Sequence, residues 1–206
     1  LYMRLIDAGA HNINLVTPTH FADVIARSLD PVLPVPVVWN SSGYERVETL
    51  RRLEGLVSVY MPDMKYSSSL LAEEYSHAPD YPDIALDAIR EMLRQTGGPQ
   101  LDSDGILSRG TLVRHLVLPG AGKNTRGVID MLAQLPQDFI FSLMAQYTPI
   151  PGIEIEYPEL GRRITQQEYD RAAEYLERSG IESYYLQGLD SATEEMLPVF
   201  DGTGTK

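Results

Sequence analysis

The chain has 206 residues, of which 43% are hydrophobic and 22% charged, a composition that predicts one domain with one core. Acidic residues outnumber basic ones by 29 to 17, giving a formal charge of −12. This balance argues against nucleic acid or an anionic membrane as a partner, because both attract basic surfaces. With no cysteine, these residues cannot form disulfides, thiolate nucleophiles or cysteine-ligated iron–sulfur sites.

No stretch approaches the roughly 18 consecutive apolar residues that a membrane-spanning helix needs, and the first residues do not have the pattern of a secretory leader. We therefore expect a cytoplasmic protein that binds neither a membrane nor nucleic acid. The chain begins at Leu1, without an initiator methionine and inside a helical pattern that Gly9 ends. We expect it to be a fragment of a longer protein.

Helical and extended patterns alternate along the chain. Six segments predict strands with the turns that follow them: residues 12–20, 35–44, 56–66, 111–120, 139–147 and 184–188. Six others have helical spacing of apolar residues: residues 1–9, 21–30, 45–55, 83–98, 124–135 and 165–180. Thr165 is the expected N-cap of the last helix.

The remaining segments predict connections. Residues 67–82 predict a structured loop, and residues 99–110 predict a solvent-facing turn or a small hairpin. We expect residues 1–188 to form the domain and residues 189–206 to form a tail. Strands that alternate with helices predict an α/β fold with a mostly parallel sheet and right-handed crossovers. The pattern alone leaves both a barrel and a doubly wound sheet open.

Polar clusters follow four of the predicted strands, at residues 17–20 (TPTH), 39–44 (WNSSGY), 62–66 (PDMKY) and 145–147 (AQY). The carboxyl ends of parallel strands meet at one rim of the sheet, where ligands bind in α/β folds. Taken singly, each cluster is equally typical of a turn or a helix cap. Together they predict one polar cavity.

Two pairs of residues refine this cavity. Asp63 and Lys65 are two apart near a strand end and share a face, so they form either a salt bridge or part of a site. Arg114 and His115 are neighbours within a strand, so only one of them faces the interior of the fold. An interior Arg114 needs an anionic partner, either a buried acid or a ligand.

Common catalytic motifs do not occur. The sequence has no GxxxxGK[ST] phosphate loop, GxSxG elbow, HExxH or dinucleotide-binding GxGxxG. Residues 119–124 (PGAGKN) are only weakly similar to a phosphate loop.

A resemblance combines these observations. In chain order, the strings HNINLVTPTHF, WNSSGYE, VYMPDMKY, YSHAPDYP, VRHLVLPG, SLMAQYTP and EYPELGRRIT resemble the radical S-adenosylmethionine superfamily, in particular proteins like pyruvate formate-lyase activating enzyme. The resemblance implies a partial (β/α)6 TIM-like barrel that lacks its first strand and cluster loop. It also implies a [4Fe–4S] cluster in the full-length parent, held by an upstream CxxxCxxC loop that this chain does not contain.

The same resemblance implies a chemistry and a binding site. The parent would reductively cleave S-adenosylmethionine to a 5′-deoxyadenosyl radical that abstracts hydrogen from a partner. The positions that match the family's cofactor-binding residues are Thr17, Thr19, His20, Asn40, Ser42, Asp63, Lys65, Arg114 and Gln146. Arg114 would lie near the methionyl carboxylate, Asn40 and Ser42 near the ribose or carboxylate, and Gln146 near the adenosine. The resemblance gives this chain no catalytic or metal-binding residue.

The implied partners are a glycyl-radical enzyme, another protein or a small molecule as substrate, with flavodoxin or ferredoxin as electron donor. Two other functions stay open. A degenerate relative without a cluster would bind S-adenosylmethionine or a partner and perform no redox chemistry. An aldolase-like lyase would use Lys65 to form a Schiff base.

Overall fold

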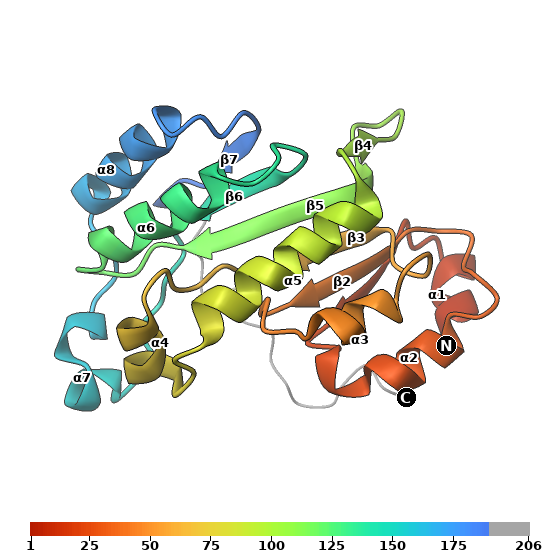
Figure 1. Cartoon of the computed structure of the whole chain (residues 1–206), viewed down its shortest axis with the longest axis horizontal. Coiled ribbons are helices and arrows are strands. Elements are labelled where there is room, and N and C mark those ends of the chain that lie inside the picture. Colours follow the sequence, from red (N-terminus) through yellow and green to blue (C-terminus); the bar gives the residue numbers. More distant parts are fainter. Residues whose placement is uncertain (190–206) are drawn as a thin grey trace.

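The computed structural model describes residues 1–189 and shows a twisted sheet with helices packed against it (Figure 1). The strands are β1 (Ile13–Val16), β2 (Val37–Ser41), β3 (Val59–Pro62), β4 (Gln100–Leu101), β5 (Leu107–Leu116), β6 (Ile140–Met144) and β7 (Tyr184–Leu186). Their order is β1-β2-β3-β5-β6-β7, with every neighbouring pair parallel. The short β4 pairs antiparallel with β5, which is the predicted hairpin.

The helices are α1 (Tyr2–Asp7), α2 (Ala22–Ser28), α3 (Val47–Arg51), α4 (Ser69–Ser76), α5 (Tyr81–Thr96), α6 (Gly122–Ala133), α7 (Ile153–Glu156) and α8 (Gln166–Glu177). Two 3-10 turns, η1 (Thr19–Phe21) and η2 (Pro158–Leu160), lie in connections. Thr165 caps α8 as predicted, in a capping box with Glu168. No helix within residues 1–189 is long and apolar enough to cross a membrane.

The strand order decides between the two architectures that the sequence left open. A doubly wound sheet reverses its strand order at a switch point, whereas here the parallel strands follow one another in chain order. Because crossovers are right-handed, an unreversed order places successive helices on the same face of the sheet. The predicted α/β fold class, a section of a barrel, is confirmed.

One predicted connection is more regular than expected. Residues 67–82 contain the helix α4 and the first two residues of α5. Between them His77 adopts a left-handed conformation with φ 49°, which ends α4. The serines and prolines of this segment favour a loop locally, but Ala72 of α4 is fully buried in the core. The predicted tail lies outside the described residues from residue 190 onward.

The helix-covered face of the sheet carries the core, in two clusters. One surrounds Trp39 and Tyr60, and the other surrounds Val113 and Phe141. All four side chains are fully buried, and burying a large apolar side chain contributes roughly 1.5–3 kcal/mol. Helix α5, which crosses the strands in Figure 1, contributes to both clusters: Ala88 and Met92 to the first, Ala85, Ile89 and Leu93 to the second.

The opposite face, which we call the open face, carries the alternate residues of the same strands. Val16 lies beside Asn40, and Asn40 beside Met61. Nearer the carboxyl ends, Asp63 lies beside Arg114. Side chains here are more accessible: Val16 is 67% exposed and Met61 is partly buried. Polar residues on this face therefore remain available to a ligand.

Tyr81, in the first turn of α5, fixes the exits of β2 and β3. Its buried hydroxyl lies 2.8 Å from the Ser42 carbonyl oxygen and 2.9 Å from the Asp63 carbonyl oxygen. It also accepts a 3.0 Å hydrogen bond from the Lys65 amide. Burial raises the pKa of this phenol far above its ordinary value, so the hydroxyl keeps its proton.

Gly43 allows the backbone segments that follow β2 and β3 to lie close together. Its φ of +78° lies in the left-handed region, and a Cβ built there would be 2.2 Å from the Asp63 carbonyl oxygen. Only glycine fits without displacing the β3 exit.

His115 and Arg114 point to opposite faces, as the alternation within β5 predicts. His115 is 1% exposed on the helix-covered face. Its Nδ1 lies 2.7 Å from the Met64 carbonyl oxygen and its Nε2 lies 3.0 Å from Thr125 Oγ1. Burial lowers the pKa of His115 from 6.5 to about 4. The neutral imidazole is therefore a structural link between β5, the β3 exit and α6.

We predict that Tyr81→Phe lowers the free energy of unfolding by about 1–3 kcal/mol, because it leaves buried backbone groups without their partner. Urea denaturation at neutral pH measures this. Tyr44→Phe is the matched control, since Tyr44 stacks on Tyr81 but bonds the exposed Asp80. A loss at Tyr81 no larger than that at Tyr44 would contradict the assigned role.

We also predict that stability falls between pH 7 and pH 5 through His115. The unfolded chain takes up this proton near pH 6.5 and the folded chain only near pH 4, so acidification favours unfolding, by about 2 kcal/mol at pH 5. His115→Gln should remove this part of the pH dependence, whereas His11→Gln, at an exposed histidine, should retain it. Equal slopes for the two variants in urea titrations at several pH values would refute the prediction.

Candidate functional site

Four predicted site residues form one polar network on the open face. Arg114 Nη2 lies 2.8 Å from Asn40 Oδ1 and 2.8 Å from Asp63 Oδ1. Lys65 Nζ donates a 2.8 Å hydrogen bond to Asp63 Oδ2. The network therefore links the carboxyl ends of β2, β3 and β5. The strand pairing that places Asp63 beside Arg114 brings the two charges together.

The network is partly shielded from solvent. The side chains of Asp63, Arg114 and Lys65 are 18%, 21% and 41% exposed. Together with the apolar side chains of Leu116, Leu118 and Met144, these three residues line a cavity of about 150 Å³. Charges held against an apolar wall interact more strongly with a ligand than charges in bulk water do.

Three buried atoms of the predicted site residues have unused hydrogen-bonding capacity. Arg114 Nε, Asp63 Oδ1 and Gln146 Oε1 are buried and make no hydrogen bond within residues 1–189. Asp63 Oδ1 lies within ion-pair distance of Arg114 Nη2, but this contact does not have the geometry of a hydrogen bond. Buried polar atoms are rarely left unsatisfied in native proteins, so each of the three needs a partner.

The other predicted site residues are not members of this network and lie at several places in the fold. The Thr17 amide donates to the Asn40 carbonyl oxygen, and Thr17 has a left-handed φ of 53°. Ser42 follows β2 and its carbonyl oxygen contacts Tyr81. Gln146 lies two residues beyond β6, with its Nε2 3.7 Å from Met144 Sδ. His20 lines a separate hollow of about 300 Å³ with Asp23 and Arg52.

The sequence analysis did not identify Glu45 as a site residue. It is 1% exposed, and its Oε1 accepts hydrogen bonds from Trp39 Nε1 at 3.1 Å and Thr19 Oγ1 at 2.8 Å. Glu45 thus joins the β1 exit to β2. An acidic residue before a helical segment is typical of a helix start, which explains the oversight. Tyr81 was likewise assigned to a loop, because its three backbone contacts are not visible in the sequence.

No described part of the chain offers a metal site. Within residues 1–189, no group of three or more His, Asp or Glu side chains is placed to hold an ion. The 206 residues include no cysteine. The residues present therefore do not fit an iron–sulfur cluster, whereas the network offers donors and acceptors for an organic ligand.

Comparison with curated proteins identifies a relative of unknown function. It is the uncharacterized protein MJ0674 of Methanocaldococcus jannaschii, which is 30% identical over 152 residues. The match covers 73% of this chain and 40% of the relative, so the chain spans about two fifths of the length of the curated protein that it matches. No family model matches the chain.

Comparison with solved structures supports the fold. A domain of pyruvate-formate lyase-activating enzyme from Bacteroides vulgatus ATCC 8482 superposes with a TM-score of 0.61 at 15% sequence identity. The superposition covers 86% of this chain and 98% of that domain. The chain therefore shares its α/β architecture with a domain of an activating enzyme.

Proposed function

We propose that this chain is the S-adenosylmethionine-binding part of a radical S-adenosylmethionine enzyme similar to pyruvate formate-lyase activating enzymes. The observation that carries the proposal is the Asn40–Arg114–Asp63–Lys65 network, which has unused capacity at the carboxyl rim of the open face. Ligands bind at this rim in related α/β architectures. The likeness to an activating-enzyme domain supports the choice of cofactor.

The residues fit the methionyl end of S-adenosylmethionine, which carries both a carboxylate and an ammonium group. Arg114 Nε is a free donor for the carboxylate, and the Lys65 ammonium adds a second positive charge beside it. Asp63 Oδ1, which is ion-paired with Arg114 but makes no hydrogen bond, is an acceptor for the ammonium. A zwitterionic group therefore satisfies atoms of both signs that the protein leaves without a hydrogen bond.

Other residues suit the rest of the cofactor. Asn40 and Ser42 offer hydrogen-bonding groups for the ribose hydroxyls, and Gln146 Oε1 is a free acceptor for the adenosine side. Thr17 and Thr19 lie on the β1 exit, which contacts β2 through the Asn40 carbonyl oxygen and Glu45. Thr19 and His20 both line the separate hollow, so the proposed contacts rest on the other seven residues.

In this enzyme class, a [4Fe–4S] cluster supplies the electron that cleaves the cofactor's sulfonium. The proposal therefore requires cysteines outside these 206 residues. The role that it assigns to this chain is to bind and orient the methionyl group and to keep it partly shielded from water. The proposal also assigns a substrate and a reductant to the whole protein. The substrate is a glycyl-radical enzyme or another hydrogen donor, and the reductant is flavodoxin or ferredoxin.

A second candidate is a binding module that holds S-adenosylmethionine without redox chemistry, which a cysteine-free chain suits. The full open reading frame separates the two candidates. A CxxxCxxC motif before residue 1 supports the enzyme, and a full-length frame without one supports the module. The aldolase-like alternative requires borohydride to trap a carbonyl substrate on Lys65, which pairs with Asp63 in this structure.

We predict that Arg114→Gln weakens S-adenosylmethionine binding by about tenfold or more, since a charge-assisted hydrogen bond contributes about 1.5–3 kcal/mol. Isothermal titration calorimetry on the 206-residue chain measures this. Arg90→Gln, which removes an exposed arginine paired with Asp87 on α5, is the matched control. Equal affinity for the two variants would assign Arg114 a purely structural role.

We further predict that the 206-residue chain, after anaerobic treatment with iron, sulfide and dithionite, forms no methionine or 5′-deoxyadenosine from S-adenosylmethionine. It has no thiolate to hold a cluster. The full-length protein, treated in the same way, should form both products. Product formation by the short chain, or its absence from a full-length protein with a loaded cluster, would contradict the proposal.

A further inference from the structure

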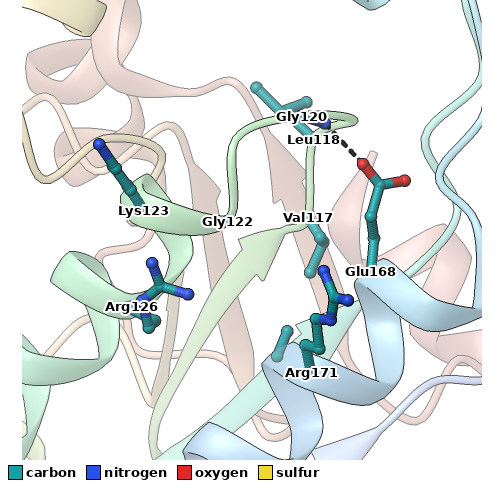
Figure 2. A pocket seen from close by; sticks show the side chains of 9 residues that line it. Val117, Leu118, Gly120, Gly122, Lys123, Arg126, Glu168 and Arg171 are labelled. Carbon is teal, nitrogen blue, oxygen red and sulfur yellow. Dashed lines mark hydrogen bonds between the residues drawn. The ribbon is translucent and has the colours of Figure 1, made fainter.

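A second cavity lies between α6 and α8, beside the loop that connects β5 to α6. Its volume is about 240 Å³. Figure 2 shows three basic side chains around it: Lys123 and Arg126 from α6, and Arg171 from α8. Lys123 and Arg126 are three residues apart, so they lie on the same side of α6. We call this cavity the basic cleft.

The basic cleft has an excess of positive charge that the residues described by the structure do not neutralise. Within residues 1–189, no carboxylate forms an ion pair with Lys123, Arg126 or Arg171. Three like charges around one cavity repel one another unless an anion enters. The whole chain has a formal net charge of −12, so this cluster of three positive charges is opposite in sign to the chain's overall charge.

Among residues 1–189, Glu168 is the one acid that lines the basic cleft, and its carboxylate already has partners. Glu168 receives two 2.8 Å contacts from the Arg162 guanidinium, one to each carboxylate oxygen. It also accepts 2.8 Å hydrogen bonds from the amides of Gly120 and Thr165. These donors hold the pKa of Glu168 well below its usual range. Glu168 therefore anchors the loop and is not available to the three cations.

The loop beside the basic cleft has unfilled space next to two of its glycines. A Cβ built at Gly120 or Gly122 would meet no heavy atom within 4 Å, so packing does not explain either glycine. Gly120 has a φ of +74°, which accounts for glycine at that position. At Gly122, the missing side chain leaves free space beside Lys123. This loop is the PGAGKN segment that is weakly similar to a phosphate loop.

We propose that the basic cleft binds a small multivalent oxyanion, a molecule with two or more phosphate or carboxylate groups. Planar guanidinium groups match both oxyanions in two-point contacts, and a lysine adds a mobile point charge. The cleft shares Leu118 with the cavity over Arg114. A bound anion would thus lie beside the network at the carboxyl rim. The proposal holds whether or not that network binds S-adenosylmethionine.

Calorimetric titration of the 206-residue chain at low ionic strength tests the proposal, with pyrophosphate and tricarballylate as separate probes. We expect one of them to bind with 1:1 stoichiometry. The tighter probe identifies the ligand as phosphate or carboxylate. Arg126→Gln and Arg171→Gln should each weaken binding about tenfold, and added salt should weaken it further.

Arg178→Gln is the matched control. It removes the same charge from the C-cap of α8, seven residues beyond Arg171 and outside the residues that line the cleft. We expect this variant to bind within about twofold of the wild type. The proposal fails if neither probe binds at a single site, or if Arg178→Gln loses as much affinity as the two cleft variants do. Circular dichroism establishes that each variant is folded.

Discussion

Two constraints determine the layout of this protein. Its parallel strands follow one another in chain order, and the crossovers that connect them are right-handed. The helices accumulate on one face of the sheet, and the apolar side chains of each strand pack beneath them. Alternate residues of the same strands face the other way. Arg114 and His115 illustrate the result, since one is a partly exposed cation and the other a buried neutral imidazole. The polar rim on the open face follows from this arrangement.

Stability and the candidate site depend on the same contacts. Tyr81 belongs to the helix that packs against both core clusters, and its hydroxyl fixes the backbone carbonyl of Asp63 and the backbone amide of Lys65. His115 bonds the carbonyl oxygen of Met64, between those two residues. The β3 exit is thus fixed from the helix-covered face while its charged side chains lie on the open face. Such support holds a binding residue in one geometry before a ligand arrives.

Much of the fold follows from local patterns. The alternation of elements, the Thr165 cap and the opposite directions of Arg114 and His115 each depend on a few neighbouring residues. The resemblance placed Asn40, Asp63, Lys65 and Arg114 at one site, and the structure brings them into contact. The buried Glu45, the Tyr81 contacts and the basic cleft could not be predicted in this way. Each depends on residues far apart in the sequence, such as Arg126 and Arg171 on two different helices.

The position of α5 has a consequence for how the molecule opens. Adjacent residues of this helix, Ala88 and Ile89, belong to different core clusters. Neither cluster can lose its packing against α5 without disturbing the other. The two halves of the sheet are therefore one cooperative unit, and the slowest amide protons of β2 and β6 should exchange with solvent through the same global opening.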